Sequence, residues 1–237
     1  MSHLLRWEVC ELYLTRMPLN TRRRGAMKLL TSPQSMHAAV QSAFPPSSLE
    51  RAGGRSLWRV DQTSDSLTAL YLVSPIEPDL SHVAEQAGWQ VGDMWQTRDY
   101  RPLLDRLAKG QMWGFKLRAN PVFHGTKADK GWADTKPLAH VTVRQQEEWL
   151  VRRAETCGFA LTSSEGTHAT SRVTNRSTLR FLKSGHRVVI ATATYDGVLT
   201  VQDPQALRRT LTEGLGRAKA YGCGLLTLAP LPIGAPG

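Results

Sequence analysis

The sequence predicts an α+β protein built from two tandem ferredoxin-like (RRM-like) domains, each with an antiparallel sheet. Candidate strands and helices follow one another in the β-α-β-β-α-β order of that fold, and the order partly recurs in the second half. The chain of 237 residues is long enough for two domains of about 100–120 residues each. We therefore expect an N-terminal domain over residues 1–100 and a C-terminal domain over 101–237, with a linker between Tyr100 and Gly110.

The first half supplies one set of these elements. A roughly alternating strand ends at Pro18, and a basic loop follows it. A helix then begins with Ser32 as N-cap and Pro33 in its first turn, and two prolines at 45–46 stop it. The candidate strands cover residues 7–17, 56–61, 66–74 and a stretch near 89–96, the loop covers 20–28, a turn lies near 63–64, and the helices cover 31–44 and 78–88.

The second half shows a similar succession. A strand over 111–121 is followed by a long loop over 119–140, and a helix ends at Gly158, a residue typical of helix C-termini. A final helix begins with Asp203 and Pro204 as its cap. The remaining predictions are a helix over 143–158, a strand over 159–166, two or three strands over 171–204 with turns at 184–185 and 196–197, and a last strand over 222–231.

Charge and composition restrict the class of partner. The formal net charge is +10, from 30 basic and 20 acidic residues, which favours a polyanion such as nucleic acid over ordinary solubilising charge. The three cysteines are scattered and form no Cys-x-x-Cys pair, so we expect neither disulfides nor a zinc site. The N-terminal stretch is too charged for a signal peptide and no long apolar run occurs, so we expect a soluble cytoplasmic protein with no membrane partner.

The segment GLGRAKAYGCG (214–224) carries two Gly-x-Gly triplets around Arg217 and Lys219. It follows a predicted helix and precedes a strand, the reverse of a dinucleotide site, and it lacks the P-loop Gly-Lys-Ser/Thr ending. Two interpretations remain. Cations at a helix C-terminus complement the helix dipole, or the glycines permit close approach of a phosphodiester chain.

His37 is the candidate for acid–base chemistry. Met36, Val40 and Phe44 form the apolar stripe of its helix, which leaves His37 at the rim where it reaches solvent and can move protons at neutral pH. The sequence has no Gly-x-Ser-x-Gly, no cysteine with a nearby histidine, no carboxylate cluster and no metal-ligand spacing of histidines. A nuclease of this kind would work without metal or cofactor and use the 2′-hydroxyl of RNA as the nucleophile.

The stretch 171–183 carries evenly spaced arginines. In an extended strand Arg172, Arg176 and Arg180 all point to one face. Such a row can follow the phosphates of a duplex, although a charged edge strand that resists aggregation has the same pattern.

Several of these segments together resemble the CasE family of CRISPR repeat-processing endoribonucleases, the processing subunit of the type I-E Cascade complex. Residues 214–230 match its C-terminal glycine-rich signature at each glycine, and the resemblance extends in order from about residue 11 to 230. The other matching segments are LTRMPLN (14–20) with the arginines after it, SMHAAVQSAF (35–44), LWRVD (57–61) and FKLRANP (115–121).

This resemblance implies cleavage of precursor CRISPR RNA at the base of a repeat hairpin, without metal or cofactor. The product would carry a 2′,3′-cyclic phosphate and stay bound, and the protein would remain with other Cascade subunits; free of them, we expect a monomer. His37 matches the family's catalytic histidine, as general acid or general base. Several relatives have a tyrosine three residues earlier, where this chain has Gln34, which leaves Ser35, Lys28 or Arg23 as substitutes.

The expected RNA contacts are cations and glycines in four parts of the chain. They are Arg22, Arg23, Arg24, Lys28, Arg118, Arg172, Arg176, Arg180, Lys183, Gly214, Gly216, Arg217, Lys219, Gly222 and Gly224. The alternatives are a non-catalytic subunit that binds hairpin RNA with the same basic surface, and a metabolic α+β enzyme with incidental charge.

Overall fold

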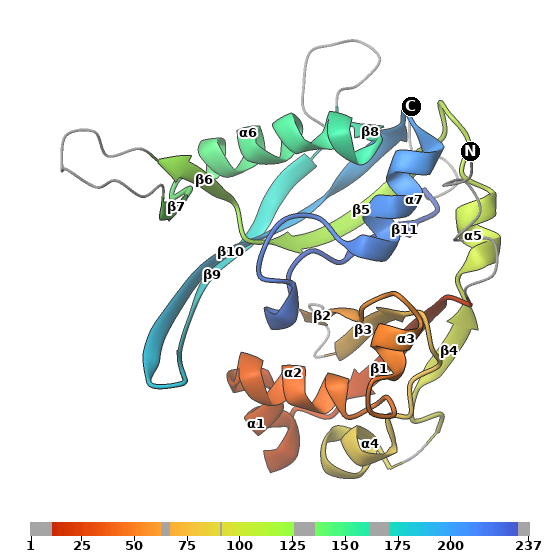
Figure 1. The fold of residues 1–237 in the computed structure, drawn as a ribbon, viewed down its shortest axis with the longest axis vertical. Helices are drawn as coiled ribbons and strands as arrows, with labels where there is room; N and C mark the ends of the chain where they lie inside the picture. The colour runs from red at the N-terminus through yellow and green to blue at the C-terminus, as the bar shows by residue number, and fades with distance from the viewer. Residues whose placement is uncertain (1–10, 63–66, 91, 126–135, 162–170, 232–237) are drawn as a thin grey trace. The chain divides into compact units, whose positions relative to one another are not determined.

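The computed structural model describes residues 11–62, 67–90, 92–125, 136–161 and 171–231 (Figure 1). The chain divides into two compact units. The first unit runs to Arg106 and also takes in Lys219–Leu225, and the second consists of Leu107–Ala218 and the chain from Leu226 onward. The division at residue 100, proposed from the sequence, did not include this late return of the chain to the first unit.

The first unit has an antiparallel sheet with the strand order β2-β3-β1-β4. Its strands are β1 (Tyr13–Leu19), β2 (Leu57–Gln62), β3 (Thr68–Ser74) and β4 (Gln96–Asp99). Its helices are α1 (Arg24–Thr31), α2 (Pro33–Gln41), α3 (Ser48–Arg51), α4 (Ser81–Ala87) and α5 (Arg101–Asp105), with a 3₁₀ turn, η3 (Lys219–Tyr221), from the returning segment. This strand order, with helices after the first and third strands, confirms the ferredoxin-like prediction.

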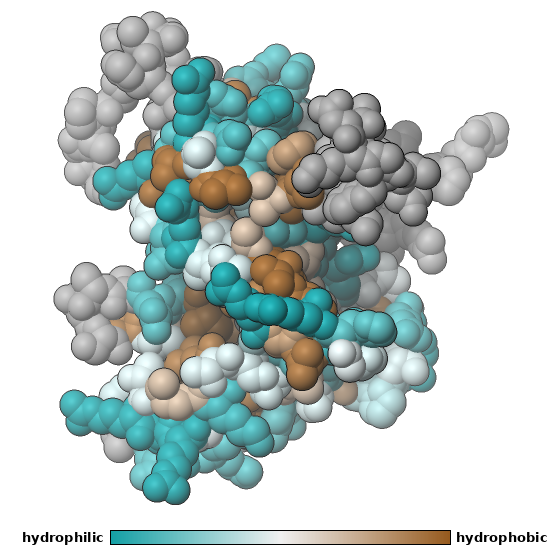
Figure 2. All heavy atoms as spheres, turned by 90° about the vertical axis from the view of Figure 1, so that its left-hand side faces the viewer, coloured by the Kyte–Doolittle hydropathy of each residue, from teal (hydrophilic) through white to brown (hydrophobic). Residues whose placement is uncertain are grey.

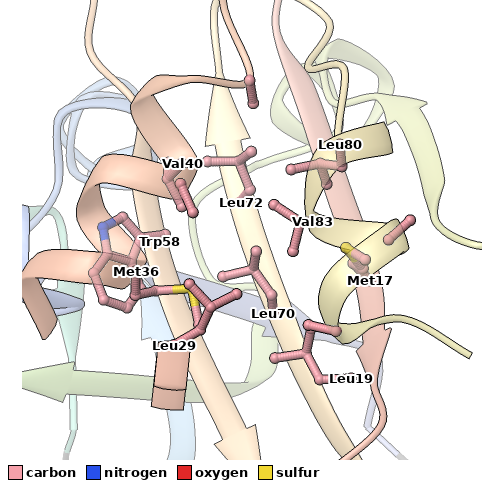
Figure 3. Packing of buried hydrophobic residues seen from close by; sticks show 14 of the residues in the cluster. Met17, Leu19, Leu29, Met36, Val40, Trp58, Leu70, Leu72, Leu80 and Val83 are labelled. Atoms are coloured by element: carbon pink, nitrogen blue, oxygen red, sulfur yellow. The ribbon is translucent and has the colours of Figure 1, made fainter. Parts of the chain in front are cut away.

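The core of the first unit lies between this sheet and helices α1, α2 and α4 (Figure 3). Met36 and Val40 of α2 are fully buried, as the apolar stripe predicts. Ser32 caps α2, because its side chain accepts a hydrogen bond from the Ser35 amide at 3.2 Å. A cap of this kind stabilises a helix by about 1 kcal/mol.

Two sequence predictions in this unit were wrong. The basic loop expected over 20–28 is helical from Arg24 onward, because Ala26 and Leu29 are buried on one side of α1 while its cations stay exposed. β1 also continues through Pro18 to Leu19. Among the described residues β4 pairs with β1 only as far as Arg16, so the missing N–H of Pro18 interrupts no ladder on that side. The turn near 63–64 lies outside the described residues.

The second unit has the strand order β11-β5-β10-β8, with β9 also paired to β10. Its strands are β5 (Met112–Ala119), β8 (Phe159–Ala160), β9 (Ser171–Lys183), β10 (His186–Val201) and β11 (Leu226–Ala229). Its helices are α6 (Val143–Ala154), the 3₁₀ turn η2 (Glu155–Cys157) and α7 (Pro204–Glu213), and α6 and α7 cover the same face of the sheet (Figure 1). The arrangement repeats the ferredoxin-like order of the first unit.

The segment expected to be a long loop over 119–140 contains a small antiparallel sheet. Strands β6 (Val122–Gly125) and β7 (Lys136–Ala139) pair along their whole length, and the His140 amide donates to the Pro121 carbonyl at 3.0 Å. The residues between the two strands lie outside the described part of the chain.

Strands β9 and β10 form a hairpin that continues past the part of β10 paired with β5 (Figure 1). The turn predicted at 184–185 is confirmed: Ser184 and Gly185 have φ of 49° and 79°, as a type I′ turn requires. The turn predicted at 196–197 is wrong, because Asp196 lies inside β10, paired with both Lys116 and Arg172. Among the described residues, no helix combines the length and apolar character needed to cross a membrane.

Gly158 is a glycine of the second unit at which any side chain would clash with backbone. Its φ is +83°, and a Cβ there would lie 2.4 Å from the Asp203 carbonyl oxygen and the Leu207 amide nitrogen. We expect Gly158→Ala to lower the free energy of unfolding by roughly 3–4 kcal/mol. Gly185 has a similar φ of +79° with open space around it, so Gly185→Ala should add only backbone strain and lower the free energy of unfolding by about 1–2 kcal/mol. Equal losses in urea unfolding would contradict the argument for a clash.

Candidate functional site

His37 lies where the helical periodicity predicts, at the rim of the buried stripe of α2. Its side chain is partly buried, with its Nδ1 atom fully covered, while the next residue, Ala38, is exposed. The imidazole is therefore held against the first unit and keeps part of its surface accessible.

The aromatic ring of Tyr221 lies beside His37. The two ring centroids are 6.5 Å apart, and the ring planes meet at 58°. Tyr221 belongs to η3, which packs against both α2 and β2 within the first unit. Sequence reasoning missed this neighbour, because 184 positions separate it from the helix. The one available signal was an aromatic residue between the two glycine triplets.

A buried arginine fastens the segment that carries Tyr221. Arg59 of β2 is 1% exposed and donates to the Leu225 carbonyl oxygen at 2.8 Å. Its Nε and Nη2 also donate to the two carboxylate oxygens of Asp61, at 2.7 and 2.8 Å, and its guanidinium lies over the ring of Tyr71. A bidentate pair of this kind compensates a buried charge and adds directional precision.

The four glycines of segment 214–224 all have positive φ. The values are 80° at Gly214, 80° at Gly216, 75° at Gly222 and 90° at Gly224. The close neighbours of the two inner glycines are tryptophans of this chain. A Cβ at Gly222 would lie 2.6 Å from the Trp58 ring, and one at Gly216 would lie 3.4 Å from Trp149.

The glycines and cations expected to contact RNA differ in burial. Gly222 is buried against Trp58, and Gly224 is buried as well. Gly214 and Gly216 are partly exposed and belong to the second unit. Arg217 is exposed, whereas Lys219 is partly buried in η3 of the first unit.

The cations after β1 do not share one role. The guanidinium of Arg23 donates to three carbonyl oxygens at the C-terminus of α4: Ala84 at 3.3 Å, Gly88 at 3.1 Å, and Glu85. An arginine near a helix C-terminus can satisfy its last carbonyls in this way, and the Ala84 carbonyl also accepts from the Gly88 amide at 2.9 Å. Arg23, expected from the sequence to contact phosphate, uses its guanidinium in the structure to cap the C-terminus of α4.

The other candidate side chains near α1 and α2 are either exposed or engaged in the cap of a helix. Arg22, Arg24 and Lys28 are exposed. The Ser35 hydroxyl donates to Ser32 Oγ at 2.9 Å, inside the cap of α2. Three groups were considered as replacements for the tyrosine that relatives have at position 34. Ser35 takes part in the cap of α2 and Arg23 in the cap of α4, whereas Lys28 has an exposed side chain.

A β-bulge divides the arginines of β9. Arg176 and Arg180 pair with Ala193 and Val189, whereas Arg172 pairs with Asp196. The shift occurs at Thr174, which has no partner of its own in the register. Paired residues of antiparallel strands share a face. The prediction that all three arginines share one face was therefore wrong.

The bulge places Arg172 on the same sheet face as Arg118 and Lys116, which pair with Thr194 and Asp196. Arg118 Nη2 donates to Ser177 Oγ at 3.3 Å and to Thr192 Oγ1 at 3.4 Å. On the opposite face, Arg176 Nη1 donates to the Val141 carbonyl at 3.2 Å. The second unit thus presents cations on both faces of one hairpin.

Lys183 is exposed next to the hairpin turn, and Leu182 and Val189 are exposed at 66% and 55%. Figure 2, seen from the side toward which the hairpin projects in Figure 1, shows hydrophilic and hydrophobic side chains close together on that face. Within the described ranges, no three histidine, cysteine or carboxylate side chains gather as a metal-binding group.

Comparison with known proteins gives this arrangement its context. A family model described as CRISPR associated protein matches residues 12–230. The CRISPR-associated endoribonuclease Cse3 of Thermus thermophilus is 31% identical over 227 residues, which cover 92% of this chain and 100% of that protein. The Cascade subunit CasE of Escherichia coli K12 is 32% identical over 122 residues, 49% of this chain and 57% of that protein.

Solved structures agree over nearly the whole chain. Cse3 bound to a 19 nt RNA has a TM-score of 0.74 at 30% identity, covering 93% of this chain and 100% of that one. Thermus thermophilus Cse3 bound to an RNA representing a pre-cleavage complex has a TM-score of 0.76 at 30% identity and the same coverage. The chain therefore belongs to the CRISPR-associated protein family, in the group that contains Cse3 and CasE.

Proposed function

We propose that this chain is a metal-independent endoribonuclease that binds the hairpin of CRISPR repeat RNA, cleaves precursor CRISPR RNA at the base of the stem and retains the product. The observation that carries this proposal is a partly buried histidine on α2, beside the ring of Tyr221, in a chain that aligns with Cse3 over the full length of Cse3. CasE is named as a subunit of Cascade. We therefore also propose that this protein remains part of such a complex, in the cytoplasm.

For this reaction the protein has to position the scissile nucleotide and to transfer protons. The 2′-oxygen at the scissile nucleotide forms a bond to phosphorus, and the bond from phosphorus to the 5′-oxygen breaks. The products are a 2′,3′-cyclic phosphate and a 5′-hydroxyl. His37 takes the proton of the 2′-hydroxyl or gives one to the leaving 5′-oxygen, and in-line alignment supplies much of the rate.

The remaining cations hold the RNA. Arg24 and Lys28 are exposed residues of α1, and exposed Arg22 lies just before this helix. Because α1 packs against the helix that carries His37, we assign these three cations to phosphates close to the cleavage point. We assign Arg118, Arg172, Arg176, Arg180 and Lys183 to the stem, with Arg217 and Lys219 as further phosphate contacts. Phosphate contacts position an RNA and make its binding fall steeply with salt.

The direct test uses a labelled repeat hairpin and the wild-type chain in excess EDTA. We expect one cut at the base of the stem, with a 2′,3′-cyclic phosphate on the upstream product, identified by mass spectrometry. A matched RNA with one stem strand scrambled, so that no hairpin forms, should remain intact. Cleavage that appears only when Mg²⁺ is restored, or that leaves a free 3′-hydroxyl, would contradict the proposal.

A further inference from the structure

We propose that Tyr221 is a second catalytic residue, whose phenol donates a hydrogen bond to the scissile phosphate held beside His37. This inference rests on the proposed function. It starts from the position of the Tyr221 ring, 6.5 Å from the His37 ring between centroids.

The two rings are close neighbours, so one phosphate group at their outer edges could accept hydrogen bonds of about 2.7–2.9 Å from both the imidazole and the phenol. Both residues are partly buried. A phosphodiester that reaches His37 thus meets the tyrosine as well.

The residues that follow Tyr221 are anchored to β2 and hold the tyrosine in place. Gly222 packs against the ring of Trp58 so closely that any Cβ would overlap it. Three residues later, the Leu225 carbonyl accepts from the buried guanidinium of Arg59, itself locked to Asp61. Catalytic groups need this kind of support, because small displacements remove much of their effect.

The chemistry also calls for a second group. When the 2′-oxygen attacks, negative charge builds up on the non-bridging phosphate oxygens while one proton leaves and another must arrive. One imidazole handles one of these protons at a time. A fixed phenol O–H aimed at a non-bridging oxygen stabilises the developing charge, and its bond strengthens in the transition state.

The test compares Tyr221→Phe with the parent in single-turnover cleavage of the repeat hairpin. We expect a rate about 10²-fold lower, with unchanged affinity for a hairpin that carries 2′-deoxyribose at the scissile nucleotide. Tyr13→Phe is the matched control, since Tyr13 Oη on β1 donates to Glu11 at 2.9 Å, away from α2. This control should cleave like the parent.

Parent-like cleavage by Tyr221→Phe would overturn the inference. If Tyr221→Leu then cleaves slowly, the ring acts by stacking with a base and the phenol takes part in no step. Parent-like Tyr221→Phe together with an inactive His37→Ala removes Tyr221 alone and leaves the proposed function intact. An active His37→Ala would instead remove the proposed function.

Discussion

His37→Ala is expected to slow cleavage of the repeat hairpin by orders of magnitude while leaving the affinity for the hairpin unchanged. Acid–base catalysis by one positioned side chain contributes about 10²–10⁴-fold to a rate, so we expect a loss in this range under single-turnover conditions. The substitution removes an imidazole whose surface is partly accessible at the rim of α2. The buried stripe of Met36 and Val40 is untouched, so the fold should survive.

The matched control for this variant is Ala38→Gln, a change at the exposed neighbour on the same helix. It alters the surface of α2 without touching the imidazole and should cleave like the parent. Thermal unfolding of both variants checks that the first unit stays folded. Parent-like cleavage by His37→Ala would show that another group moves the protons, and the site would have to be placed elsewhere.

A substrate with 2′-deoxyribose at the scissile nucleotide is expected to bind normally and to resist cleavage completely. The proposed nucleophile is the 2′-oxygen of the RNA, so the substitution deletes the attacking atom and no catalytic group can replace it. The measurement is single-turnover cleavage of the modified hairpin with the wild-type chain, beside a binding titration of the same RNA.

The control RNA carries the deoxyribose one nucleotide downstream, where the sugar is not the nucleophile, and it should be cut at the normal rate. Cleavage of the scissile-site deoxy substrate would point to water or a protein side chain as the nucleophile. A subunit that only binds hairpin RNA would cut neither RNA, so the control also separates the enzyme from the non-catalytic alternative.

Local patterns were sufficient for most of the fold. The apolar stripe of α2, its Ser32 cap and the Asp203 cap of α7 depend on neighbours within one or two turns, and each lies in the structure where the sequence places it. The predictions failed where a local signal was overruled by distant partners. Asp196 and Gly197 look like a turn, but pairing with strands on both sides keeps them in β10.

The arginines of β9 show the same limit at a finer scale. Residues at even spacing lie on one face of a strand only if no bulge interrupts the strand between them. The bulge at Thr174 shifts the register by one residue and moves Arg172 to the face opposite Arg176. No pattern in the β9 sequence marks this position. Thr174 Oγ1 donates to the Asp196 carboxylate at 2.5 Å, a contact that requires β10 to be in place.

The two ferredoxin-like units and the helix that presents His37 can be predicted from the sequence, because periodicity, caps and turn residues act over a few positions. The surroundings of that histidine depend on the folded chain. Tyr221 reaches it because the chain returns to the first unit at Lys219–Leu225. Trp58 and Arg59 hold the returning segment there, and contacts between residues more than 160 positions apart leave no periodic trace in a single sequence.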